Sequence, residues 1–289
     1  MGLLFVAAAA IFSVLVSILL KWMPRRGIDV AQAVTWNYLC AAALCLLLLD
    51  PPLDALRAPA APWPALLLLA VVLPSLFLVL AASVRRAGIV RTDAAQRLSL
   101  LLSLIAAFTF LGERAGAQKL AGLALGLIAV AAIVARPDPR AARGDGALVP
   151  LLTVWVGFAL VDVALKLIAR AGIPFAASLL AAFAFAFIGM LAVQLVRHAR
   201  GRTRLRWKNL AAGLALGALN FGNIVCYVRA HQALPESPAV VFASMNIGVV
   251  VLGTLAGVLL FGEKTGRWNR LGIALAIVAI SLIAFAPRG

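Results

Sequence analysis

The stretch LGERAGAQKLAGLALGLIAVAAIVARP, residues 111–137, recurs with substitutions as FGEKTGRWNRLGIALAIVAISLIAFAP, residues 261–287. The two stretches align without a gap at an offset of 150 residues, and each opens with a Gly-Glu-basic turn before an apolar helix. The matched pairs include Gly112 with Gly262, Glu113 with Glu263, Gly122 with Gly272 and Pro137 with Pro287. Self-similarity at an offset of about half the chain length indicates two copies of one structural unit.

The composition places the chain in a membrane. Of its 289 residues 64% are hydrophobic and 12% are charged, and no soluble domain of this length buries so much apolar surface. We expect the net charge of +16 to come from Lys and Arg in loops on one membrane side, and we expect no nucleic-acid partner. The first apolar run starts at Gly2 without a basic flank, which predicts a retained helix instead of a cleaved signal.

The apolar runs predict the helices directly. A spanning helix needs roughly 20 mostly apolar residues. Ten segments meet this length, namely 2–20, 31–49, 63–84, 91–111, 117–135, 147–169, 175–197, 208–230, 236–261 and 267–286. Pro, Gly and charged residues separate them, as is typical of connections between helices. The sequence therefore predicts an all-α membrane protein with ten transmembrane helices.

The repeat extends beyond the stretch quoted first. SVLVSILLK (13–21) aligns with FALVDVALK (158–166), and Gln96 falls opposite Asn246. The chain then divides into a first five-helix repeat at 1–137, a linker at 138–146 and a second five-helix repeat at 147–289. Because five is odd, the second copy enters the membrane from the opposite side, which gives a 5+5 inverted-topology repeat. This plan suits alternating access, with a site near the midplane between two halves that rock about it.

The loop charges predict an orientation. The loops that follow the first, third, fifth, seventh and ninth segments hold most of the basic residues, and the longest basic run is RHARGRTRLRWK (197–208). Basic loops stay in the cytoplasm, so the count puts both ends of the ten-helix unit outside it.

The pattern of an apolar helix, a Gly-Glu-basic turn and a second apolar helix, once per half, resembles the drug/metabolite transporter superfamily in its EamA-like ten-helix form. The resemblance rests on residues 108–133 and 257–283, on IFSVLVSILLK (11–21) with its terminal Lys, and on ALPESPAVVFASMNIGVVV (233–251). It implies a transporter whose cargo is one of many small metabolites, and efflux as the direction. Members of the superfamily are commonly drawn with both termini in the cytoplasm, which conflicts with the charge count.

Asp162 is the sharpest candidate for function, because a carboxylate in the middle of a spanning segment is costly unless it has a role. We interpret it as a proton-coupling or cation-binding group. The structural alternatives are an ion pair with Lys166, one turn further on, or a place on the wall of a water-filled cavity. Lys21 and Lys166 are equivalent in the two repeats, and each can bind an anionic group of the substrate or snorkel to the headgroups.

Further candidates are amides and aromatic residues inside apolar segments. Asn220, Asn223 and Tyr227 share one helical face and predict a cavity wall, because such a polar stripe avoids lipid. Gln96 and Asn246, related by the repeat, either contact substrate or join helices by hydrogen bonds. Trp36 either lines the site or belongs to an interfacial aromatic belt.

The Gly-Glu-basic turns and the spaced glycines have structural interpretations. We expect Glu113 and Glu263 to cap the helix that follows each, or to pair with Arg114 and Lys264. The glycine pairs at 122 and 126, at 213 and 217, and at 253 and 257 predict close helix crossings.

Catalytic and metal-binding motifs are missing from the sequence. It has no Walker loop, no HExxH, no Gly-x-Ser-x-Gly and no cluster of His or Cys. We therefore expect no enzyme, no cofactor and no bound metal, and three free cysteines.

Together these features predict a secondary transporter that exports a small polar or amphipathic metabolite across the bacterial inner membrane, by alternating access and with proton coupling. Its partners are then the substrate and membrane lipids, and we expect a monomer. One alternative is a translocase for lipids or lipid-linked sugars that binds phosphate through Lys21, Lys166 or Arg229. Another is a non-transporting membrane subunit whose loop at 197–208 recruits a partner or anionic lipid.

Overall fold

The computed structural model describes residues 1–58, 61–110, 116–134, 146–236 and 238–285. Within these residues every long element is an α-helix, as the apolar runs predicted. The predictions made for Glu113, for Arg114 and for residues 138–145 of the linker fall outside the described residues.

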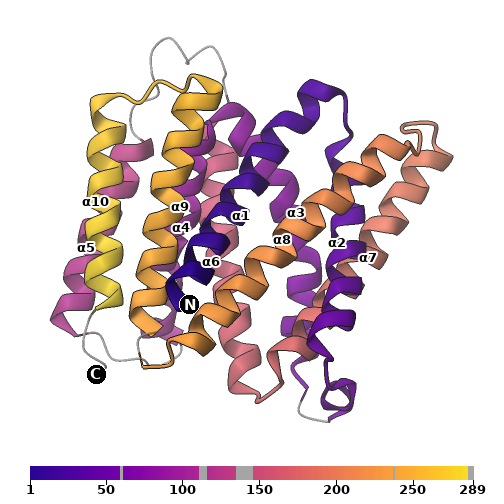
Figure 1. Ribbon diagram of the computed structural model, residues 1–289, viewed down its shortest axis with the longest axis horizontal. Coiled ribbons are helices and arrows are strands. Elements are labelled where there is room, and N and C mark those ends of the chain that lie inside the picture. The colour runs from indigo at the N-terminus through magenta and orange to yellow at the C-terminus, as the bar shows by residue number, and fades with distance from the viewer. Residues whose placement is uncertain (59–60, 111–115, 135–145, 237, 286–289) are drawn as a thin grey trace.

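Ten helices cross the molecule (Figure 1). They are α1 (Gly2–Trp22), α2 (Val30–Leu49), α3 (Trp63–Arg86), α4 (Ile89–Phe110), α5 (Ala117–Val134), α6 (Leu148–Arg170), α7 (Phe175–Ala199), α8 (Trp207–Ala233), α9 (Pro238–Phe261) and α10 (Arg267–Ala284). Two short 3-10 helices, Met23–Arg26 and Leu53–Arg57, lie in connections. Each α-helix boundary lies within three residues of its predicted position, so the predicted all-α membrane fold with ten helices is confirmed.

Eight of the helices are long and apolar enough to span a membrane on their own. The other two are α4 and α5. Helix α4 carries Arg91, Asp93 and Arg97, and these charges lower its mean hydropathy. Helix α5 contributes the shorter apolar stretch Leu120–Ala129. Helix α4 packs against α5, α6 and α9, and α5 packs against α10 and α4. Asp93 of α4 is buried, and Arg91 and Arg97 are half-buried.

The helix contacts obey the symmetry of the repeat. Helix α1 packs against α8 and α9, and its equivalent α6 packs against α3 and α4. Likewise α2 packs against α8, and α7 packs against α3. Three contacts are their own equivalents, namely α2 with α7, α4 with α9, and α5 with α10. Adding five to the number of each helix thus returns the same set of main contacts, as expected for a 5+5 inverted repeat.

These contacts gather the helices into two groups that are not the two halves of the sequence. The α1 bundle comprises α1, α2, α8 and α9, with α10 joined to it through α9. The α6 bundle comprises α3, α4, α6 and α7, with α5 joined to it through α4. The contacts of α5 with α10, α2 with α7 and α4 with α9 join the two bundles, and the contact of α5 with α10 is the most extensive in the molecule. Each bundle takes helices from both repeats, because α1 and α2 pack on the second repeat and α6 and α7 pack on the first. The two bodies that face each other therefore differ from the halves between which we expected the site.

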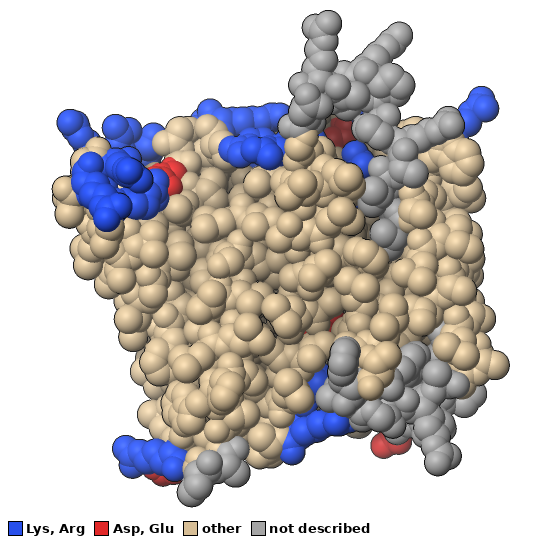
Figure 2. Space-filling view, turned by 180° about the vertical axis from the view of Figure 1, so that it is seen from behind, with Lys and Arg blue, Asp and Glu red and all other residues tan. Residues whose placement is uncertain are grey.

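A broad uncharged band separates two charged faces of the molecule (Figure 2). We call the basic face the end where α1, α3, α7 and α9 finish, and the sparse face the opposite end, where α1 begins and α10 finishes. Described cations near the basic face include Arg25, Arg26, Arg85, Arg86, Arg200, Arg202, Arg204, Arg206, Lys208, Lys264, Arg267 and Arg270. This arrangement of apolar helices between two charged rims is that of a multi-pass membrane protein.

The spaced glycines lie at helix crossings, as predicted. A methyl group on Gly217 of α8 would lie 2.7 Å from the backbone oxygen of Asn37 in α2. On Gly122 of α5 it would lie 2.7 Å from a side-chain carbon of Ile283 in α10, and on Gly257 of α9 it would lie 2.7 Å from Val90 in α4. Helices approach closely at these points because no side chain intervenes.

Candidate substrate cavity

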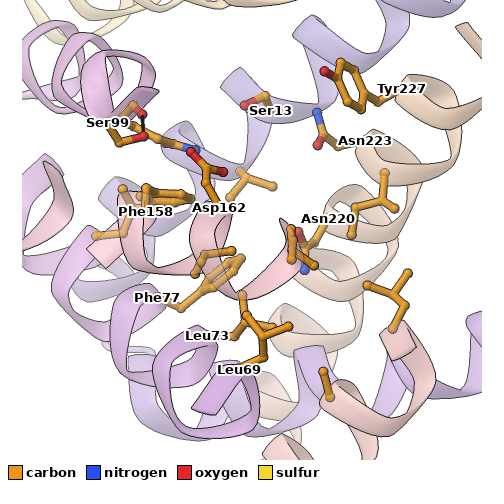
Figure 3. A pocket seen from close by; sticks show the side chains of 18 of the residues that line it. Ser13, Leu69, Leu73, Phe77, Ser99, Phe158, Asp162, Asn220, Asn223 and Tyr227 are labelled. Atoms are coloured by element: carbon orange, nitrogen blue, oxygen red, sulfur yellow. Dashed lines mark hydrogen bonds between the residues drawn. The ribbon is translucent and has the colours of Figure 1, made fainter. Parts of the chain in front are cut away.

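A cavity of about 380 Å³ lies between the two bundles. The α1 bundle lines it with α1, α2, α8 and α9, and the α6 bundle lines it with α3, α4, α6 and α7. Most of the wall is apolar, including Leu69, Leu73, Phe77 and Phe158 (Figure 3). A volume of this size lies within the range of small-molecule sites, which are mostly apolar with a few polar groups.

Six of the residues predicted from the sequence line this one cavity: Gln96, Asp162, Asn220, Asn223, Tyr227 and Asn246. Figure 3 shows Asp162 on one side of the space and Asn220, Asn223 and Tyr227 on the other. Asp162 lies on α6 of the α6 bundle, and the other three lie on α8 of the α1 bundle, so the two sides of the cavity come from opposite bundles. The contacts of these residues with a substrate stay predictions.

The carboxylate of Asp162 has three neighbours that influence its charge. The hydroxyl of Ser103 lies within hydrogen-bonding reach, and Lys166 and Arg97 interact with it electrostatically. Asp162 is thus both near Lys166 and on the cavity wall, which were the two structural alternatives for this residue. A charged group at this depth is costly, and functional residues are the common exception.

The amides of α8 and α9 are partly held by their own surroundings. Asn223 donates to the backbone oxygen of Ala9 at 2.7 Å, and Asn246 donates to that of Phe242 at 2.8 Å. Asn220 donates to the side-chain oxygen of Asn37 at a longer 3.4 Å. Each amide has two N–H donors and one acceptor oxygen, so these bonds fix its position and leave groups free for the cavity.

Three predicted site residues are not among the cavity-lining residues. Trp36 packs against Phe187, with ring centroids 6.4 Å apart, at the crossing of α2 with α7 and α8. Lys21 is buried in an ion pair with Glu263. Lys166 lies near Asp162 but outside the lining. The geometry gives none of the three a direct contact with the cavity, and we leave them out of the proposed binding site.

Arg97 and its neighbours are functional candidates that were not predicted from the sequence. Arg97 lines the cavity from α4 and donates to the hydroxyl of Ser13 at 2.7 Å. One turn before it, buried Asp93 accepts a hydrogen bond from Ser17 of α1 at 2.8 Å. The rule that singled out Asp162, an ionisable residue inside a spanning segment, applies equally to Asp93 and Arg97. The same rule could therefore have identified Asp93 and Arg97 from the sequence.

Glu263 has a different role from the one expected. It accepts backbone N–H bonds from Ile89 at 2.7 Å and from Val90 at 3.1 Å, so it caps α4 and not the helix that follows it. Its ion-pair partner is Lys21 of α1, not the neighbouring Lys264. Local spacing predicted a local partner, whereas the packing of α9 against α4 supplied a distant helix terminus.

Ten helices in an inverted repeat, with a mostly apolar cavity that holds a few polar residues between two bundles, define a multi-pass membrane protein of the transporter type. The family model of the EamA-like transporter family matches residues 1–135. An uncharacterized protein of Haemophilus influenzae is 36% identical over 288 residues, with 97% of each chain covered. The chain belongs to the EamA-like transporter family, part of the drug/metabolite transporter superfamily.

Two further likenesses are partial or distant. A UPF0060 membrane protein of Nocardia farcinica is 37% identical over 84 residues, which is 29% of this chain and 68% of that protein. One solved chain, described only as a protein crystal structure, superposes with a TM-score of 0.54 at 17% identity and covers 95% of both chains. At that identity the solved chain supports the fold alone.

Proposed function

We propose that the protein is a secondary active transporter that exports a small amphipathic metabolite across the bacterial inner membrane. The observation that carries the proposal is the cavity between two symmetry-related bundles, lined by polar residues from both. Inverted-repeat transporters place their substrate site at such an interface and expose it alternately by rocking one body against the other. Here the rocking bodies are the α1 and α6 bundles. Export as the direction and the inner membrane as the location are taken from the resemblance to the family.

The cavity wall supports an amphipathic cargo. Arg97 and Asp162 supply opposite charges on the α6 bundle, and Asn220 and Asn223 supply amides on the α1 bundle. Leucine and phenylalanine side chains line much of the remaining surface (Figure 3). A cargo therefore places its polar group between Arg97, Asp162 and the amides, and packs its apolar part against Leu73 and Phe77. Because burying a charge away from water is costly, the polar group of the cargo must make the hydrogen bonds that water would otherwise make to these charges.

Asp162 is the proposed proton-coupling residue. Its carboxylate faces the cavity and lies near the positive charges of Arg97 and Lys166. Proton binding at Asp162 removes a negative charge from that group, so the wall becomes more positive when the cavity faces the side of higher proton activity. Release of the proton reverses this change. The protonation state of Asp162 then affects two things: the relative stability of the two arrangements of the bundles, and the charge of the cargo that the cavity binds best.

The test is charge movement in proteoliposomes, with amino acids, sugars, nucleosides and organic cations as separate probes. Wild type is compared with Asp162→Asn, and with Asp54→Asn as a matched control, because the side chain of Asp54 is 94% exposed and lies outside the cavity. We expect one compound class to give a pH-dependent current in wild type and in Asp54→Asn, and about a hundredfold smaller current in Asp162→Asn.

Each other result contradicts part of the proposal. If Asp162→Asn keeps the current, Asp162 is not the proton-coupling residue, but the transport proposal still stands. If no probe gives a current, tracer uptake follows, since electroneutral transport moves cargo without net charge. If neither current nor tracer uptake is seen, and labelled lipid moves between leaflets, the protein is a lipid translocase and the transport proposal is rejected.

A further inference from the structure

The cavity is displaced toward the sparse face. Its lining reaches Phe175, the first residue of α7, and Phe242 in the second turn of α9, and both helices begin at the sparse face. Toward the basic face the lining on α3 stops at Leu80, six residues before that helix ends at Arg86. Beyond Leu80 the interior is packed, with Val84 fully buried. The bundles are therefore in contact between the cavity and the basic face.

Glu263 makes one of these contacts. It lies in the turn between α9 and α10 of the α1 bundle, and it accepts the first two N–H groups of α4 in the α6 bundle. The first N–H groups of a helix have no partner within the helix and carry the positive end of its dipole. A carboxylate at this position satisfies two donors at once, and it does so across the boundary between the bundles.

The surroundings of Glu263 are shaped to hold this carboxylate. Two glycines leave room for it: a methyl group on Gly88 would lie 2.6 Å from its Oε2 atom, and one on Gly257 would lie 2.8 Å away. Gly88 also has a φ of +89°, which other residues rarely adopt. Lys21 of the same bundle pairs with the carboxylate, and the side chains of Lys21 and Glu263 are only 9% and 14% exposed. In such a shielded pair, losing one charge leaves the other uncompensated.

A second contact between the bundles lies deeper in the membrane. Ser17 of the α1 bundle donates to Asp93 of the α6 bundle at 2.8 Å, and both residues are buried. The second carboxylate oxygen of Asp93 has no hydrogen-bond partner in the described part of the chain. The hydrogen bond between Ser13 and Arg97 comes next, at the cavity itself. A row of three polar contacts across the bundle boundary thus leads from the basic face to the cavity.

We propose that Glu263 is the latch that closes the cavity at the basic face, and that transport requires its release from the N-terminus of α4. The inference rests on the proposed alternating access. The ion pair between Asp29 and Arg197 also joins the two bundles at the basic face, and it must break as well. When Glu263 leaves Ile89 and Val90, the two bundles separate at this face and the contact of Ser17 with Asp93 breaks next. Contacts on the sparse face form as the cavity closes there.

The experiment measures cysteine accessibility in lipid nanodiscs, in a background without the three native cysteines. Val84→Cys reports on the basic side, and Val228→Cys, at the sparse end of the lining on α8, reports on the sparse side. Each reporter is combined with Glu263→Gln, or with Glu236→Gln as the matched control, an exposed glutamate near the sparse face. A membrane-impermeant thiol reagent is added without any substrate, and the modification rates are compared.

We expect Glu263→Gln to raise the rate at Val84→Cys about fivefold and to lower the rate at Val228→Cys, because losing one cap shifts an equilibrium by about that factor. Glu236→Gln changes neither rate. Lys21→Met, which removes the ion-pair partner, shifts both rates in the same directions as Glu263→Gln.

Two outcomes overturn the latch. Unchanged rates mean that Glu263 does not hold the bundles together, and a rise at both reporters means that the variant only loosens the fold. Because the labelling needs no cargo, it separates the latch from the transport proposal. If the two labelling rates shift in opposite directions but the protein moves none of the probes, the latch is supported and the proposed cargo is rejected. If the protein moves a probe but the labelling rates do not change, transport is supported and the latch is rejected.

Discussion

Arg97 and Asp162 put opposite charges on the same wall of the cavity, although they lie on different helices of the α6 bundle. Asp93, one turn from Arg97, has its charge turned toward α1 instead. The ionisable residues of the interior therefore have two functions in our proposals. Some meet the cargo, and others join the two bundles. Both kinds are expensive to bury, which is why most are hydrogen-bonded or near an opposite charge.

Asp29 gives a pH-dependent contact that can be tested without cargo. It caps α2 at the basic face and links the bundles by an ion pair with Arg197 of α7 at 2.9 Å. Burial by itself raises the pKa of Asp29, but the hydrogen bond and the charge of Arg197, with help from Gln32 and Thr203, outweigh it and lower the pKa below its ordinary value. The ionised form is thus favoured by folding.

We predict that the stabilisation by Asp29 is fully present above its unfolded pKa, about 4, and is lost as the pH falls through its lower folded pKa. Thermal unfolding in detergent is measured for wild type and Asp29→Asn. Since the two side chains are 26% and 30% exposed, the variant is less stable by about 1 kcal/mol at pH 7. The difference disappears at the lowest pH. Asp54→Asn, in an exposed pair, changes nothing, and a pH-independent loss in Asp29→Asn would contradict the electrostatic account.

At the scale of helices, glycine decides how closely α8 approaches α2. A methyl group on Gly217 would lie 2.6 Å from the Cβ of Cys40 and 2.7 Å from the backbone oxygen of Asn37. Backbone cannot turn away as a flexible side chain can, so the helices must separate. The α8 residues that line the cavity, Asn220 and Asn223, follow Gly217 within two turns. The crossing therefore sets the position of the amide wall.

We predict that Gly217→Ala destabilises the protein by about 2 kcal/mol, because the added methyl overpacks the crossing. Gly189→Ala is the matched control, since Gly189 of α7 has open space where the methyl would go. That variant should be neutral or more stable, because alanine favours helix over glycine by up to about 1 kcal/mol. Unfolding in a denaturing detergent measures both. Equal effects from the two variants would show that helix propensity, and not the crossing, determines the result.

For the whole molecule, the unequal charge of the two faces bears on orientation. The basic face carries far more described Lys and Arg than the sparse face, and the loop at 200–206 alone supplies Arg200, Arg202, Arg204 and Arg206. Positively charged loops are retained in the cytoplasm. With ten helices, the start of α1 and the end of α10 share the other side.

We predict that the sparse face lies outside the cytoplasm, against the common habit of the superfamily. A reporter enzyme that is active only in the periplasm is fused after residue 289, and a second fusion inserts it at residue 201 in the connection between α7 and α8. The first fusion should be active and the second inactive. Replacing the four loop arginines by Gln should reduce this bias. Activity of the residue 201 fusion alone would establish the opposite orientation and place the proposed latch on the outer side.

The sequence by itself determined the ten helices, the inverted repeat and most of the polar cavity wall. These properties depend on residues that are close in the sequence. Helices follow from runs of apolar residues. Asp162, Asn220 and Asn223 stand out because polar side chains inside an apolar segment avoid lipid. Arg97 and Asp93 carried the same signal. Only the tertiary structure decided that α1 and α2 pack on the opposite repeat, that Glu263 caps α4, and that Lys21 is held in an ion pair away from the cavity. Partners so far apart in the chain are chosen by the packing of whole helices, and no local pattern of residues encodes that choice.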